Sequence, residues 1–149
     1  MIEEAFLGNS DLYVIRFASV FELSARLTMD VLNDYQSSDQ ILKRLEDAGF
    51  ESPSVFLSHA RVTRNLSGEK NILGERSLSF LRKAEALNFQ NKSEILLEKA
   101  ITYNYMNRWA DAIDTLLELR EETDRIEVAT DAFIDTQLIQ IKARAAFQK

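Results

Sequence analysis

One stretch of the sequence, from Asn91 to Leu119, constrains the fold more than any other. Apolar residues recur at helical spacing on both sides of a short break at residues 106–108. Helices joined by so short a connection cannot point the same way, so the stretch predicts an antiparallel helical hairpin. Asn107 suits the left-handed conformation that ends a helix, and it could equally cap the next one. The apolar positions are Ile95, Leu96, Ala100 and Tyr103 before the break, and Trp109, Ala112, Ile113, Leu116 and Leu119 after it.

The rest of the chain favours helices as well. Its 149 residues include one Pro and four Gly, and so few chain-breaking residues favour an all-helical fold. The least regular part is residues 67–75, which contain two of the glycines. Elsewhere, apolar residues recur at intervals of three and four. This periodicity predicts helices over residues 11–35 (one helix or two), 40–48, 55–66, about 76–87 and 126–147.

Local signals mark where several of these helices begin and end. Ser37 and Gln40 have the spacing of a capping box, which predicts a helix start. Gly49 suits the left-handed position after a helix, with Phe50 folding back on the last turn. Ser52–Pro53 is typical of the next start, with Ser as the cap and Pro as the first helical residue.

A repeated spacing links three parts of the chain. Three positions in the second helix of each predicted hairpin, and one closing residue, follow at intervals of four, three and five. The closing residues are Pro53, Phe89 and Asp124, which lie 36 and 35 positions apart. A period of this length is typical of solenoids of helical hairpins. The three sets are Ile41, Leu45 and Ala48; Ser77, Leu81 and Ala84; and Ala112, Leu116 and Leu119.

The central stretch resembles a tetratricopeptide repeat (TPR). That family has an aromatic residue late in the first helix and another after the turn, as Tyr103 and Trp109 are here. Ala112 fits a small position of the second helix, whereas Leu119 and Asp124 replace the family's Ala and Pro. The middle unit departs further, because its interhelix connection is predicted to be long. The resemblance implies a single all-α domain, a right-handed α-α superhelix of about three TPR-like hairpins (10–53, 54–89 and 90–124), with an N-terminal arm (1–9) and a C-terminal capping helix (126–147).

The resemblance also implies a function. TPR proteins are binding scaffolds, and the first helices of their units line a concave groove that holds a peptide or helix of a partner protein. We therefore expect an adaptor or chaperone-like scaffold and no enzymatic activity. The sequence lacks the set of Lys, Asn and Arg with which some TPR proteins clamp a C-terminal carboxylate. By position, the groove candidates are Arg26, Asp30, Asn33, Ile101, Asn104 and Tyr105.

Two other hypotheses stay open. The chain could be a regulatory or oligomerisation domain of a larger assembly, with a homodimer through the C-terminal helix and its residues Ile134, Leu138 and Ile141. A helical-bundle enzyme is disfavoured, since no acid–base cluster, cofactor site or metal site is evident. His59 is the sole histidine, and we expect it to be a buried structural residue rather than a base or metal ligand.

Charge and composition limit the partners. A formal charge of −6 argues against nucleic acid, and no apolar run could span a bilayer. The N-terminus lacks the basic region of a signal peptide, and the absence of Cys suits a reducing compartment; we expect a cytoplasmic protein. Nine acidic residues lie between Asp111 and Asp135, against two bases. They predict either a solvated outer face or a patch that attracts a basic partner.

Overall fold

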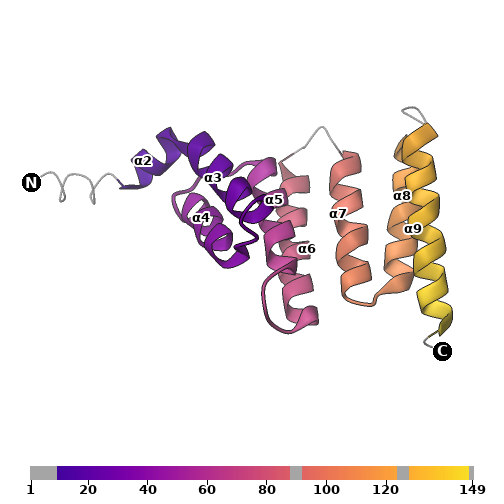
Figure 1. Cartoon of the computed structure of the whole chain (residues 1–149). Coiled ribbons are helices and arrows are strands. Elements are labelled where there is room, and N and C mark those ends of the chain that lie inside the picture. The colour runs from indigo at the N-terminus through magenta and orange to yellow at the C-terminus, as the bar shows by residue number, and fades with distance from the viewer. Residues whose placement is uncertain (1–9, 88–91, 124–127, 148–149) are drawn as a thin grey trace, which may run out of the picture.

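The computed structural model describes residues 10–87, 92–123 and 128–147, and every regular element within them is an α-helix (Figure 1). The predicted all-α fold is confirmed. The predicted arm at residues 1–9 and the closing residues Phe89 and Asp124 lie outside the described residues. The helices are α2 (Ser10–Arg16), α3 (Ala18–Asp30), α4 (Tyr35–Asp47), α5 (Pro53–Arg64), α6 (Lys70–Ala86), α7 (Lys92–Tyr105), α8 (Trp109–Thr123) and α9 (Val128–Phe147).

The helices follow one another along an open row. The pairs α3–α4, α5–α6 and α7–α8 pack as hairpins, and α9 packs on α8. Helix α5 also contacts both α3 and α7, the first helices of the neighbouring pairs. Figure 1 shows α2, α3 and α4 at one end of the row and α8 and α9 at the other.

The segment over residues 11–35 forms two helices followed by a turn. A kink at Phe17 separates α2 from α3, and α3 ends at Asp30. Asn33 adopts a φ of +52° in the turn that follows, a conformation that Asn tolerates better than most residues. The sequence left one or two helices open because the apolar positions drift around the axis, and the break at Phe17 decides for two.

The start of α4 differs from the prediction. The helix begins at Tyr35 rather than near Gln40, and Asp34 is its cap. The Ser37 hydroxyl donates to Asp34 Oδ2 at 2.7 Å, and the Ser37 backbone N–H donates to Oδ1 at 3.0 Å. These hydrogen bonds lower the pKa of Asp34. Ser37 therefore lies in the first turn, and the predicted capping box of Ser37 and Gln40 is wrong because Asp34 already caps the helix.

The predicted end of α4 and start of α5 are confirmed. Gly49 has a φ of +83°, and the Phe50 N–H donates to the Leu45 carbonyl at 3.1 Å. This is the Schellman arrangement, in which a residue in the left-handed region lets the chain close the helix. Helix α5 then begins at Pro53 with Ser52 in the cap position.

The irregular connection predicted over residues 67–75 is shorter than expected. Helix α6 begins at Lys70 rather than near Arg76, so Gly74 lies inside the helix. A Cβ atom at Gly74 would lie 2.2 Å from Cγ of Met106. The glycine therefore permits the close approach of α6 to the end of α7 and does not interrupt the helix. Only residues 65–69 join α5 to α6, which removes the long connection predicted for the middle pair.

The central hairpin closes as its sequence predicts. Asn107 has a φ of +60°, and the Arg108 N–H donates to the Tyr103 carbonyl at 2.8 Å. The repeated positions of the second helices α4, α6 and α8 point inward: Ile41 is half-buried, and the other eight are buried. Small residues among them, such as Ser77 and Ala112, allow helices to pack closely at equivalent places in successive pairs.

Buried polar groups join the middle of the row. Glu98 of α7 is 5% exposed and accepts hydrogen bonds from Arg61 Nε at 2.6 Å and from Arg64 Nη2. Arg64 also donates to the Glu98 carbonyl and to Thr102 Oγ1, each at 3.0 Å. Burial opposes the charged form of Arg61, but Glu98 and then Glu94 outweigh it and raise the pKa of Arg61. Two first helices, α5 and α7, are thus joined by a charged contact that is largely closed to water.

His59 of α5 is buried, as the sequence predicts. It is 1% exposed, and its ring stacks on Phe80 with centroids 4.0 Å apart. Its Nδ1 lies 2.6 Å from Glu46 Oε1 and its Nε2 lies 2.7 Å from Asp39 Oδ1. Both ring nitrogens are therefore engaged by carboxylates of α4, so the histidine ties α5 to its neighbour.

Candidate interaction surface

Helix α3 carries apolar residues on the side that faces away from the core. Its buried residues are Ala18, Ala25 and Met29, whereas other apolar residues lie exposed on the opposite side. Leu27, in the middle of that side, is 51% exposed, and Leu32, just after the helix, is 70% exposed. We call this surface the α3 face and define it by Val20, Leu23, Ser24, Leu27, Thr28, Val31 and Leu32.

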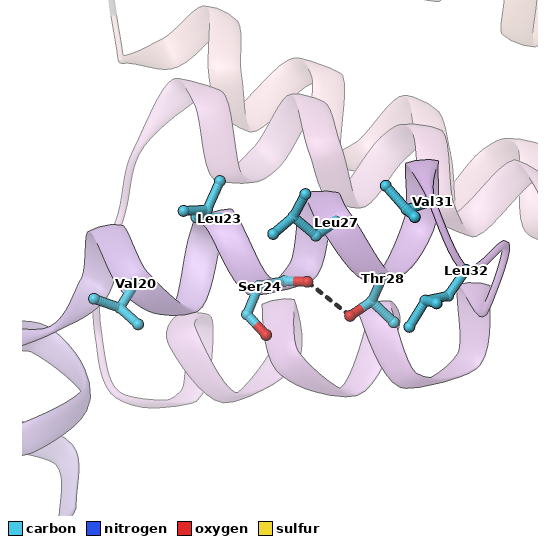
Figure 2. Close-up of a pocket in the computed structure, with 7 residues that line it drawn as sticks. All are labelled: Val20, Leu23, Ser24, Leu27, Thr28, Val31 and Leu32. Carbon is cyan, nitrogen blue, oxygen red and sulfur yellow. Dashed lines mark hydrogen bonds between the residues drawn. The ribbon is translucent and has the colours of Figure 1, made fainter.

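The α3 face consists of two rows with a shallow depression of about 440 Å³. Figure 2 shows Leu23, Leu27 and Val31 in one row along the helix. In the second row, the short side chains of Ser24 and Thr28 lie between the larger Val20 and Leu32. Because the Thr28 hydroxyl donates to the Ser24 carbonyl at 2.7 Å, it is satisfied within the helix. A partner that fills the depression therefore needs to supply few hydrogen bonds.

The inner side of α3 packs directly on α4. Ser38 of α4 is fully buried, and its hydroxyl donates to the Ala25 carbonyl at 2.8 Å. This contact brings the two helices close together at the small Ala25, and Met29 packs into the core one turn further along. The outer residues have no such neighbour among the described residues. Five apolar residues of the α3 face are each 51–70% exposed, and together they form a contiguous patch of the kind that is about 300–600 Å² at its largest on a soluble monomer.

The six groove candidates do not form one site. Arg26 and Asp30 are exposed on α3, on the strip of helix surface directly beside Leu23, Leu27 and Val31. Asn33 lies in the turn after α3 with its left-handed backbone, so it does not share a helix face with them. It lines a polar cleft of about 360 Å³ with residues 34–36, Asp39 and residues 65–67.

The three candidates on α7 lie elsewhere along the row. Ile101 and Asn104 line a cavity of about 180 Å³ that α8 and α9 help to enclose, and Arg144 of α9 donates to Asn104 Oδ1 at 3.4 Å. Tyr105 packs against the core, and the Lys70 ammonium lies 5.4 Å from its ring centre. The structure thus places Asn104 under α9 rather than on an open wall.

The last helix uses its apolar residues within the chain. Ile134, Leu138 and Ile141 are buried in a cluster with residues of α7 and α8, Leu116 among them. The hypothesis that these three residues pack on a second copy is therefore wrong, because the row itself covers them. Ile139, on the outer side of α9, is 69% exposed.

The acidic stretch is partly neutralised inside the chain. Asp111 pairs with Arg108 at 2.9 Å, and Asp135 pairs with Arg120 at 2.9 Å. Lys92 lies 3.2 Å from a Glu122 carboxylate oxygen, and hydrogen bonding to Glu122 raises the pKa of Lys92. These exposed pairs reduce the field available to attract a basic partner, and such attraction stays a prediction.

The sequence contains a pattern that corresponds to the α3 face, but helical periodicity alone does not identify that surface. Residues 18–32 carry apolar side chains on two opposite sides of one helix. Among the described residues, a helix at the end of the row has neighbours on one side only, so they leave one of its two apolar sides uncovered. The pattern indicated a helix, but it did not indicate that α3 would be at the end.

The described residues contain neither a candidate metal site nor a candidate membrane-spanning helix. No group of three His, Asp or Glu side chains among them is placed to hold a metal ion. Within residues 10–87, 92–123 and 128–147, no helix has the length and apolar character needed to cross a bilayer. No protein-family model, curated protein or solved structure matches this chain.

Proposed function

We propose that this chain is a cytoplasmic TPR-like scaffold that binds another protein chain through the α3 face. The single observation that carries the proposal is the exposed apolar surface around Leu27, on the side of α3 that faces away from the core. Large uncovered apolar patches with polar borders are typical of protein–protein contacts. Arg26 and Asp30 form such a border here.

The TPR-like part of the proposal rests on three features. Helices pair in sequence, and the first helices of adjacent pairs touch. Equivalent positions of the second helices, such as Leu45, Leu81 and Leu116, are buried. Short connections close the pairs, including the left-handed Asn107. These features are what a right-handed superhelix of about three hairpins requires, and an adaptor or chaperone-like role is consistent with it.

The energetics of the α3 face suit reversible binding. Covering an apolar patch of about 300–600 Å² contributes on the order of 12 kcal/mol at about 25 cal/mol per Å². Lost translational and rotational freedom costs about 4–15 kcal/mol. The two contributions are of the same order, and at most about 8 kcal/mol is left over, which corresponds to micromolar or weaker association.

The proposal is tested by capturing partners with the full chain carrying Leu27→Glu. A buried carboxylate in the middle of the α3 face should abolish capture. Ile139→Glu is the matched control, because it places the same charge on an exposed apolar position of α9. Circular dichroism should show the same helix content for both variants and the unmodified chain.

Two outcomes would contradict this assignment. Full capture by Leu27→Glu would exclude the α3 face as the contact. Loss of capture in the double variant Asn104→Ala, Tyr105→Ala, with Leu27→Glu still active, would return the site to the predicted groove on α7.

A further inference from the structure

We infer that the partner covering the α3 face is a second copy of this chain, with α3 packed against α3 about a two-fold axis. The inference rests on the proposed function, because it names the partner of the same surface. It also replaces the C-terminal helix as the place of self-association, since Ile134, Leu138 and Ile141 are buried within the row.

The position of α3 in the row is the first argument. In a stack of helical hairpins, each pair is covered by the next, and an end pair that stays in water needs a polar outer side. The outer side of α3 instead carries residues such as Leu23, Leu27 and Val31, which are 51–66% exposed. This end of the row therefore has the surface of an internal position, and another helical pair of the same kind completes it.

The shape of the α3 face is the second argument. Leu23, Leu27 and Val31 form a ridge at intervals of four, and the neighbouring row is lowered at Ser24 and Thr28 (Figure 2). Ridges at this interval fit the grooves of a second helix at a crossing angle of about −50°. An axis between the two rows places the ridge of each copy in the depression of the other. One helix thus supplies both complementary shapes, as a two-fold contact requires.

Area and charge are consistent with this pairing. Two such patches, each of about 300–600 Å², together approach the roughly 1,000 Å² at which specific protein contacts begin. The α3 face contains no charged residue, although the chain carries a formal charge of −6. The bordering Arg26 and Asp30 of the two copies fall on opposite sides of the axis, so like charges do not face each other across the contact.

The first test is the mass of the full chain in solution, measured by sedimentation equilibrium from 1 to 100 µM, concentrations chosen to bracket weak association. We expect a concentration-dependent rise from the 17.1 kDa of one chain to twice that mass. Leu27→Glu should stay at the mass of one chain throughout, and Ile139→Glu should behave like the unmodified protein. A single-chain mass for the unmodified protein at 100 µM, or an unchanged dimer of Leu27→Glu, would overturn the inference.

The second test uses the absence of cysteine from the sequence. Ser24→Cys places a thiol near the two-fold axis, and mild oxidation should yield a disulfide-linked dimer. Ile139→Cys, at an exposed position remote from the α3 face, should remain mostly monomeric under the same conditions. Equal cross-linking of the two variants would contradict α3 pairing. This test, unlike Leu27→Glu, introduces no charge into the α3 face.

The two proposals can fail separately. A monomeric chain that captures a different protein, and loses it with Leu27→Glu, would overturn the second copy while keeping the α3 face as the contact. A monomeric chain whose captured proteins are unaffected by Leu27→Glu would overturn both.

Discussion

Helices α3 and α5 are each the first helix of a pair, yet they distribute polar and apolar residues in opposite ways. Helix α5 is covered by neighbours, and it buries polar residues such as Ser58, His59 and Thr63. Helix α3 lies at the end of the row and exposes apolar residues such as Leu23 and Leu27. The position of a helix along the row, rather than its hydrophobic pattern, therefore decides which residues stabilise the fold and which remain available for contacts.

The largest effect is expected where α5 meets α7. Replacing Glu98 by Ala leaves the guanidinium of Arg64, whose side chain is 10% exposed, without its carboxylate. Breaking a buried ion pair by removing one partner costs about 3–5 kcal/mol. Chemical denaturation should show this loss, whereas Glu75→Ala, which removes one of the two exposed partners of Arg108, should cost less than about 1 kcal/mol. Equal losses would mean that the covered centre of the row is no more sensitive than its surface.

A smaller effect is expected where α6 approaches α7. Gly74→Ala introduces a methyl group into the space of Met106, and such overpacking costs about 1–3 kcal/mol. Met106→Ala in the same chain should relieve the clash, so the double variant should lose less than the two single losses added together. Strict additivity in thermal denaturation would contradict the close approach that explains this glycine.

The cap of α4 should contribute a still smaller, pH-dependent amount. Hydrogen bonds from Ser37 lower the pKa of Asp34 in the folded chain. The stabilisation is therefore present above the unfolded Asp pKa of about 3.9 and is lost as the pH falls through the folded value. The melting temperature of Asp34→Ala should lie slightly below that of the unmodified chain at pH 7, and the gap should close in acid. A gap that persists at pH 2 would show that Asp34 acts in another way.

The smallest effect on stability is expected on the α3 face. Leu27→Ala should change the free energy of unfolding by no more than about 0.5 kcal/mol in dilute, monomeric protein, because exposed substitutions usually do little. Leu45→Ala, in the buried part of α4, should cost about 2–5 kcal/mol. A loss of that size at Leu27 in dilute protein would place the residue inside the monomer's core.

Much of the fold could be predicted from the sequence because its signals are local. The stop at Gly49 and the turn at Asn107 depend on backbone preferences of single residues, and both are confirmed. Gly74 was predicted to be part of an irregular connection, but it lies inside a helix. A glycine is needed there because the side chain of Met106, which is distant in the sequence, comes too close for a Cβ atom. The start of α4 was misplaced because Asp34 and Ser37 are both good caps, and the sequence does not decide between them.

The candidate site was harder to predict than the fold. The resemblance to TPR proteins indicated groove positions by analogy, but Asn33 is in a turn and Asn104 lies under α9. The exposure of Leu27 depends on which helix is at the end of the row, and this is a property of the whole arrangement. The carboxylate partners of the buried His59 were missed for the same reason, since Asp39 and Glu46 come from another helix.

The most direct test of the account is methyl NMR of the Leu and Val side chains in a dilution series of the full chain. The account predicts concentration-dependent shifts for Leu23, Leu27 and Val31 of the α3 face, with the buried Leu42 and Leu81 unchanged. Shifts confined to other surfaces, or the absence of any shift around Leu27 when the protein associates or binds a partner, would contradict it.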